Sequence, residues 1–241
     1  MMGLRLGAGG DSAGVGCCLA QGYLALGYFE WIYSELRRTP VPLHSQLETQ
    51  LDAYVCYWEQ VPTAPPALVE TQKQVAERFA ALLASAEDPF VRTTFPGHFT
   101  ASALIVTPDY SRTLLTHHRK LDRWLQLGGH ADGDRQLLAV ARREGHEESG
   151  LADLAPASTS LPELYDLDIH WIPPHKHEPG HFHYDARYLL VTSTPESIAI
   201  SEESHALEWF TIDRAYQVTE GESFHRLLDK LRFVREERDC R

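Results

Sequence analysis

The stretch from Gly129 to Leu151, GHADGDRQLLAVARREGHEESGL, constrains the fold more than any other part of the chain. With Asp134 as the N-cap, it predicts a helix from Arg135 to Ser149, because no proline interrupts that run. Gly150 is the residue type that ends a helix in a left-handed cap. The sequence therefore predicts a helix of about four turns that follows a glycine-rich turn.

Three glutamates share one side of this helix. Glu144, Glu147 and Glu148 fall within one arc of its surface, beside an apolar stripe formed by Leu137, Leu138 and Ala141. Clustered carboxylates repel one another unless a cation lies among them or each points into water. Oxygen ligands favour Mg²⁺ or Mn²⁺, whereas zinc usually recruits Cys or His. On these residues alone, both a metal site and a solvated acidic face remain open.

The segment resembles the Nudix box, G-x5-E-x7-R-E-U-x-E-E-x-G-U, in which U is aliphatic, and it matches in register over its whole length. The matching positions are Gly129, Arg143-Glu144, Glu147-Glu148 and Gly150-Leu151. The resemblance implies an α/β fold of the Nudix type, an α/β/α sandwich around a mixed sheet. It also implies that Glu144, Glu147 and Glu148 are the metal ligands, joined by a main-chain carbonyl near Gly128.

Two positions depart from the box. Arg135 stands where the family has its first Glu, and Gly145 stands where the family has an aliphatic residue. Because that first Glu pairs with the box Arg in the family, Arg143 needs another acid here, and Asp132 and Asp134 are the candidates. Gly145 should cost up to about 1 kcal/mol of helix stability relative to Ala, unless close packing against the sheet requires it.

The resemblance implies a metal-dependent hydrolase that cleaves a diphosphate linkage in a small, nucleoside-derived substrate. Glu144, Glu147, Glu148 and Arg143 would be the catalytic residues, and Mg²⁺ or Mn²⁺ the cofactor. Some family members take a general base from a late loop, where Glu202 and Glu203 are candidates. The alternative is a Nudix-fold nucleotide sensor or interaction module without hydrolysis, because one fold can host several functions. The intact carboxylate trio counts against that alternative.

The charge balance limits the partners. The chain has 34 acidic and 22 basic residues and a net charge of -12, which argues against broad nucleic-acid binding and against attraction to anionic membranes. A small phosphorylated substrate remains compatible, because a bound metal supplies local positive charge. No run reaches the roughly 18 apolar residues that span a membrane. The four cysteines form neither a metal-binding pattern nor a disulfide framework, so we expect reduced thiols and a cytoplasmic protein.

We expect two parts in the chain. Residues 1–90 form a glycine-rich and helical extension, and residues 91–241 form a Nudix domain. Helices are expected from Tyr23 to Tyr57 in two pieces, the second beginning near Ser45, and from Ala67 to Ser85. Three roles are open for this extension: covering the sheet, forming a homodimer surface, or shaping the substrate mouth.

The N-terminus contains a motif of another enzyme class. Gly10-Asp11-Ser12-Ala13-Gly14 fits G-x-S-x-G, the nucleophile elbow of serine hydrolases. That elbow needs a strand before the serine, and the preceding residues MMGLRLGAG make no convincing strand. A serine hydrolase that uses Ser12 is therefore a remote alternative.

The remaining elements follow from alternation and turns. The pattern predicts a hairpin of strands 101–107 and 113–116, a strand at 124–127 that leads into Gly128, late strands at 198–200 and 207–212, and a closing helix from Ser223 to about Glu237.

A second informative stretch runs from Asp166 to Val191, where polar and apolar residues alternate in two runs joined by a proline-rich loop. The pattern predicts an antiparallel pair with one polar face. Histidines and cations in this acidic chain suggest an anion site, and the predicted substrate contacts are Trp124, His181, His183, Arg187 and Lys120. Two other interpretations are a solvent-facing strand surface and a second metal site of His175, His177, His181 and His183.

Overall fold

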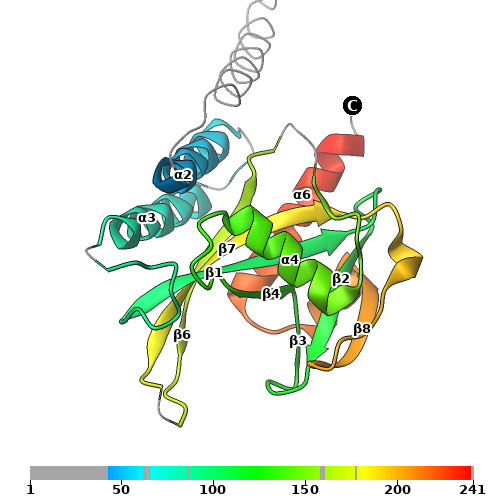
Figure 1. Cartoon of the computed structure of the whole chain (residues 1–241). Coiled ribbons are helices and arrows are strands. Elements are labelled where there is room, and N and C mark those ends of the chain that lie inside the picture. Colours follow the sequence, from blue (N-terminus) through cyan, green and yellow to red (C-terminus); the bar gives the residue numbers. More distant parts are fainter. Residues whose placement is uncertain are drawn as a thin grey trace, which may run out of the picture. The chain divides into compact units, whose positions relative to one another are not determined.

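The computed structural model describes residues 43–61, 64, 66–85, 87–157, 161–176 and 178–239. The first predicted helical piece and Ser12 lie outside these residues. The described residues belong to one compact unit that begins at Leu43. In Figure 1 a curled mixed sheet lies between helices on both sides, which confirms the predicted α/β class.

The sheet is built around β1 (Gly97–Val106), which is buried along its whole length. One edge of β1 pairs in parallel with β7 (His181–Val191), and the other pairs antiparallel with β2 (Arg112–His118) and β4 (Leu127–His130). The outer strands are β3 (Arg123–Leu125), β5 (Ala155–Pro156), β6 (Leu164–Ile172) and β8 (Ser204–Thr211). Both predicted antiparallel pairs, β1 with β2 and β6 with β7, are confirmed.

Alternation along β1 separates two hydrophobic cores, because successive side chains of a strand point to opposite faces. Phe99, Ala101 and Ile105 face the first core, which also contains residues of α2, α3 and α4. Leu104 and Val106 face the second core, which contains residues of α5 and α6.

Helices α2 (Leu43–Gln60) and α3 (Pro66–Leu83) begin within two residues of their predicted starts. Leu47, Leu51 and Tyr54 of α2, with Phe79 of α3, are buried in the first core. Of the three roles open for this region, the structure therefore supports covering the sheet. No helix of the described residues is long and apolar enough to cross a membrane.

The C-terminal part differs from prediction in one strand and one helix. Residues 198–200 are not a strand, since they follow a short 3-10 turn (Pro195–Ser197) and Ala199 N–H donates to the Ser149 carbonyl at 2.7 Å. Ile212 starts helix α5 (Ile212–Val218), whose N-cap is the Thr211 hydroxyl, instead of ending a strand. The closing helix is confirmed as α6 (Glu222–Asp239).

Candidate active site

Helix α4 (Leu137–Ser149) carries the three glutamates and begins two residues later than predicted. The N-cap is Gln136, whose side chain makes no capping hydrogen bond, and not Asp134 as predicted. The Asp134 carboxylate instead accepts the Gln136 N–H at 2.9 Å in the turn before the helix. Gly150 ends the helix with φ 74°, as predicted for a left-handed cap.

Gly145 lets α4 approach the sheet closely. A Cβ at this position would lie 2.8 Å from Leu154 Cδ1 and 3.3 Å from Ile105 Cδ1. The departure from an aliphatic residue therefore reflects packing, and it fixes the distance between the helix and β1.

The main chain of β4 touches two of the glutamates. Gly128 N–H donates to Glu148 Oε1 at 2.9 Å. A Cβ at Gly129 would lie 2.5 Å from Glu144 Oε2, so only glycine leaves room for this carboxylate. Glu147 is exposed beside them.

The glutamates lie in a setting that disfavours negative charge. Burial, with the nearby charges of Glu144, Glu203 and Glu147, raises the pKa of Glu148 to about 7, although the Gly128 hydrogen bond lowers it. Burial also raises the pKa of Glu144, while Arg143 opposes that shift. Two half-buried carboxylates and an exposed one thus share a region that lacks full charge compensation.

Arg143 has acidic partners, which the sequence analysis expected in place of the first box Glu. Its guanidinium contacts Glu144 Oε1 at 3.0 Å and Asp134 Oδ2 at 3.9 Å, and it donates to the His130 carbonyl at 3.4 Å. Asp132, the other candidate, pairs instead with Arg92 at 2.6 Å. Arg143 therefore links α4 to the end of β4.

Arg135, at the position of the first box Glu, also has an acidic partner. Its guanidinium lies 2.6 Å from Asp88 Oδ2 and over the Phe90 ring. The departure therefore joins the start of the box to the segment before β1.

The donor set fits a hard divalent cation. Glu144 and Glu148 offer carboxylate oxygens beside the Gly128 and Gly129 main chain, and oxygen is the ligand that Mg²⁺ and Mn²⁺ prefer. A cation at this place would also offset the repulsion that raises the Glu148 pKa.

The two general-base candidates lie in the exposed turn before β8. The Glu203 charge acts on Glu148, and the Glu203 carbonyl accepts the Arg119 N–H at 2.9 Å. Of the two candidates, Glu203 is therefore the one whose charge raises the pKa of Glu148.

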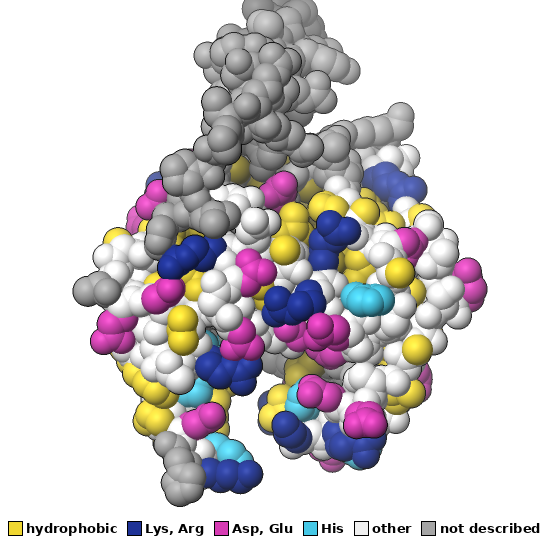
Figure 2. All heavy atoms as spheres, in the orientation of Figure 1, with side chains coloured by type: hydrophobic (Ala, Val, Ile, Leu, Met, Phe, Trp, Pro, Cys, Tyr) yellow, Lys and Arg dark blue, Asp and Glu magenta, His cyan; other side chains and the backbone are white. Residues whose placement is uncertain are grey.

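The predicted substrate contacts occupy different environments. Trp124 is half-buried and packs edge-on against Phe210, with ring centroids 4.8 Å apart. Lys120 is exposed in the turn between β2 and β3. In Figure 2 the surface is hollowed between this turn and the ends of β6 and β7, and acidic and histidine side chains border the hollow.

Arg187 lies in a buried ion network. Its guanidinium contacts Asp185 at 2.9 Å, Asp168 at 3.0 Å and Asp166 at 3.2 Å, and only 6% of its side chain is exposed. Arg187 is therefore paired and buried within the protein, and its prediction as a substrate contact is not supported. The polar faces of β6 and β7 are largely buried here, so their interpretation as a solvent-facing surface is wrong for this part.

The histidines form a cluster that differs from the predicted group. His183 and His181 lie with His98 on β1 and His130 on β4, with ring centroids 4.8 to 5.3 Å apart. His175 is exposed, and its main chain bridges to Glu178 in the loop after β6. His177 lies outside the described residues.

His98 and His130 are the members that the sequence analysis missed. The parallel register of β1 with β7 places His98 opposite His183, and the antiparallel register of β1 with β4 brings in His130. The one available signal was that His130 directly follows the box glycines. Pairing between distant strands leaves no local pattern.

Burial favours the neutral form of three imidazoles of the cluster, those of His98, His130 and His183. Burial, and then Arg92, lowers the pKa of His130 to about 4. Burial also lowers the pKa of His98 and of His183. Neutral imidazoles keep a nitrogen lone pair that can bind a metal.

Solved structures similar to this chain include three hydrolases. An Ap4A hydrolase from C. elegans in a binary complex is 18% identical over 56% of this chain and 96% of its own, with a TM-score of 0.41. A NUDIX-family hydrolase from Clostridium perfringens is 23% identical over 57% and 97%, with a TM-score of 0.42. E. coli dihydroneopterin triphosphate pyrophosphohydrolase is 17% identical over 55% and 92%, with a TM-score of 0.45.

A comparison with curated protein sequences found no match. The NUDIX domain model matches residues 97–230, more than half of the chain and all of the sheet and α4. The protein therefore belongs to the Nudix family.

Proposed function

We propose that the protein is a metal-dependent pyrophosphohydrolase that cleaves a diphosphate linkage in a small, nucleoside-derived substrate. The observation that carries the proposal is the hydrogen bond from Gly128 N–H to Glu148, together with the Glu144 carboxylate in the space beside Gly129 that a side chain would fill, next to exposed Glu147. Carboxylates with raised pKa values, gathered at one place, are suited to a divalent cation.

Glu144, Glu147 and Glu148 would hold Mg²⁺ or Mn²⁺, with the Gly128 carbonyl as a further oxygen. When bound, the metal supplies positive charge for the phosphate oxygens and makes a water more acidic. The Gly128 N–H orients Glu148, and Arg143 holds Glu144 against β4. Glu203 is proposed to accept the proton of the attacking water.

The substrate would enter the hollow between the β2–β3 turn and the β6–β7 ends (Figure 2). Lys120, in the β2–β3 turn at one side of this region, can meet a phosphate. His181 is 6% exposed and its Nε2 lies 3.2 Å from His183 Nε2, so these two imidazoles contact each other and are not proposed as substrate contacts. Trp124 offers part of a ring face for a base.

The test is a release assay for phosphate and nucleotide across a panel of nucleoside diphosphate derivatives, with Mg²⁺, with Mn²⁺ and with a chelator. Turnover should require the metal. Glu147→Gln and Glu148→Gln should each lower kcat by roughly 10²–10³-fold. Glu236→Gln, an exposed glutamate on α6, is the matched control and should leave kcat unchanged.

The proposal is abandoned if both variants keep wild-type metal-dependent turnover. Absence of turnover together with tight nucleotide binding in calorimetry would replace it with the sensor function. Turnover that needs no metal and disappears in Ser12→Ala would instead identify a serine hydrolase.

A further inference from the structure

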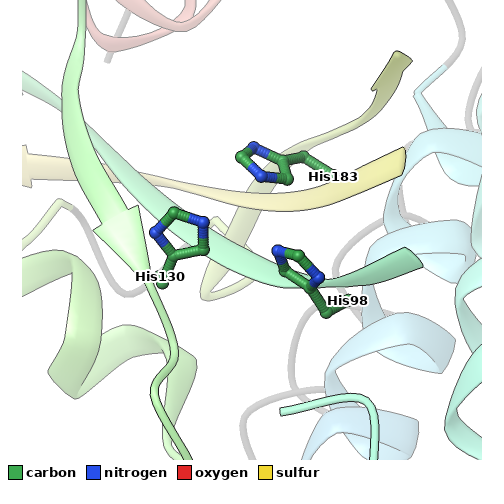
Figure 3. A group of neighbouring side chains, drawn as sticks. All are labelled: His98, His130 and His183. Atoms are coloured by element: carbon green, nitrogen blue, oxygen red, sulfur yellow. The ribbon is translucent and has the colours of Figure 1, made fainter. Parts of the chain in front are cut away.

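A second group of side chains, near the glutamates, consists of imidazoles, which bind a different class of metal ion. One nitrogen from each of His98, His130 and His183 lies within 4.8 Å of the others. Figure 3 shows the three rings turned toward one another from β1, β4 and β7. Among the described residues, these three histidines are the group of possible metal ligands whose donor atoms lie this close together.

His98 has a nitrogen that lacks a partner. Its Nδ1 lies 3.2 Å from the Thr94 carbonyl oxygen, so Nδ1 carries the proton and donates it. Its Nε2 therefore keeps a lone pair, and this atom is buried without a hydrogen-bond partner among the described residues. The residue is 1% exposed and Nε2 itself is buried, so the lone pair is removed from water. An imidazole fixed through one nitrogen, with the other left open, has the arrangement of a metal ligand.

His181 extends the cluster. Its Nδ1 lies 2.9 Å from the Pro179 carbonyl oxygen, and its Nε2 lies 3.2 Å from His183 Nε2. Two nitrogen ligands of one tetrahedral ion lie about 3.4 Å apart when each is about 2.1 Å from the metal. The His181 and His183 nitrogens already have this spacing, so His181 or a water can fill the fourth position.

Closing the group around an ion requires little movement. The ligand nitrogens now lie within 4.8 Å of one another, and around an ion these distances must fall to about 3.4 Å. Side-chain rotation can supply this change, because the three strands already form adjacent ladders. Arg92, whose charge lowers the pKa of His130 and of His98, is paired with Asp132 at 2.6 Å.

We propose that His98, His130 and His183 bind a divalent transition-metal ion of the zinc type, at a site separate from the α4 glutamates. Imidazole nitrogens select zinc-type ions, whereas carboxylates select Mg²⁺ and Mn²⁺. The bound ion ties β4 to β1 and β7 directly after Gly129, beside which the Glu144 carboxylate lies. The site does not depend on the proposed hydrolysis.

The experiment uses the full chain without an affinity tag, stripped with a chelator and then titrated with ZnCl₂ by calorimetry. Excess Mg²⁺ is present to occupy the carboxylates. We expect one tight equivalent of Zn²⁺ and a higher thermal midpoint. His130→Asn and His183→Asn should each weaken binding by more than the roughly 10–100-fold that loss of an outer-shell partner costs.

Two matched controls separate the histidine site from the glutamate site. His205→Asn changes an exposed histidine on β8 and should bind Zn²⁺ as the wild type does. Glu148→Gln should also bind Zn²⁺ normally, whatever its effect on hydrolysis.

X-ray absorption at the zinc edge of the wild type provides a test that needs no variant. Three or four imidazole nitrogens at about 2.0–2.1 Å support the proposal. A shell of oxygen alone, no stoichiometric zinc, or binding that is lost in Glu148→Gln and kept in His130→Asn would overturn it.

Discussion

At position 129 a side chain would occupy the space that the Glu144 carboxylate fills. A Cβ there would lie 2.5 Å from Glu144 Oε2, whereas a Cβ at 128 would lie 2.6 Å from the Ala101 carbonyl oxygen and from Ser102 Cα. The first obstacle is the end of a side chain that can rotate away, and the second is main chain of the paired strand. The two neighbouring glycines should therefore respond differently to the same substitution.

We predict that Gly129→Ala displaces Glu144 and weakens metal-dependent turnover while keeping most of the stability. Gly128→Ala should instead lower the free energy of unfolding by about 1–3 kcal/mol, because β4 must move away from β1. Urea unfolding and the metal dependence of kcat measure the two effects. Equal stability losses in both variants would contradict the assignment.

At the scale of elements, helix α4 depends on a glycine inside its buried face. Gly145→Ala gains up to about 1 kcal/mol of helix propensity, but the added methyl meets Leu154 Cδ1 at 2.8 Å, and overpacking costs about 1–3 kcal/mol. We expect a net loss of about 1 kcal/mol in urea unfolding. Arg142→Ala on the exposed side of α4 is the control and should change stability by less than about 0.5 kcal/mol. A more stable Gly145→Ala would mean that the helix does not need this close approach.

The local elements were predictable, whereas their long-range pairing was not. Periodicity located α2, α3, α6 and most strands, because alternation and helical spacing are local signals. The box placed Glu144, Glu147 and Glu148 correctly on α4. The pairing of β1 with β7, which brings His98 beside His183, depends on residues far apart in sequence. The burial of Arg187 likewise depends on Asp166 and Asp168 of another strand.

At the scale of the whole molecule, a buried ion network joins β6, β7 and α6. Asp166 is fully buried and contacts Lys230 at 2.6 Å, Arg226 at 2.9 Å and Arg187 at 3.2 Å. Lys230 is 2% exposed, and its ammonium also donates to the Tyr54 hydroxyl of α2 at 2.7 Å. The network therefore connects the helices before the family domain to its closing helix.

We predict that Asp166→Asn lowers the free energy of unfolding by about 3–5 kcal/mol, because buried Arg187 and Lys230 and half-buried Arg226 lose the charge they share. Glu59→Gln is the control, since Glu59 pairs with Lys73 at 3.0 Å on the surface, where such pairs contribute at most about 1 kcal/mol. Chemical denaturation measures both. A loss for Asp166→Asn no larger than for the control would show that the network is not stabilising.

Acid should weaken the same network. Burial by itself raises the pKa of Asp166, but Lys230 and Arg226 outweigh it and lower the pKa to about 2, from an ordinary value of 3.8. The unfolded chain therefore binds a proton before the folded chain does, so stability falls as the pH drops from about 4 toward 2. The loss from this group is roughly 2–3 kcal/mol. Unfolding midpoints across this range should fall in the wild type and change less in Asp166→Asn.

Binding of Mn²⁺, followed by electron paramagnetic resonance, tests most directly whether the α4 glutamates hold the catalytic metal. The protein is first loaded with Zn²⁺, so that the histidine cluster does not compete for Mn²⁺. The account predicts bound Mn²⁺ in the wild type and in Glu236→Gln, and a clear loss of affinity in Glu148→Gln. Equal Mn²⁺ affinity in all three proteins would contradict it.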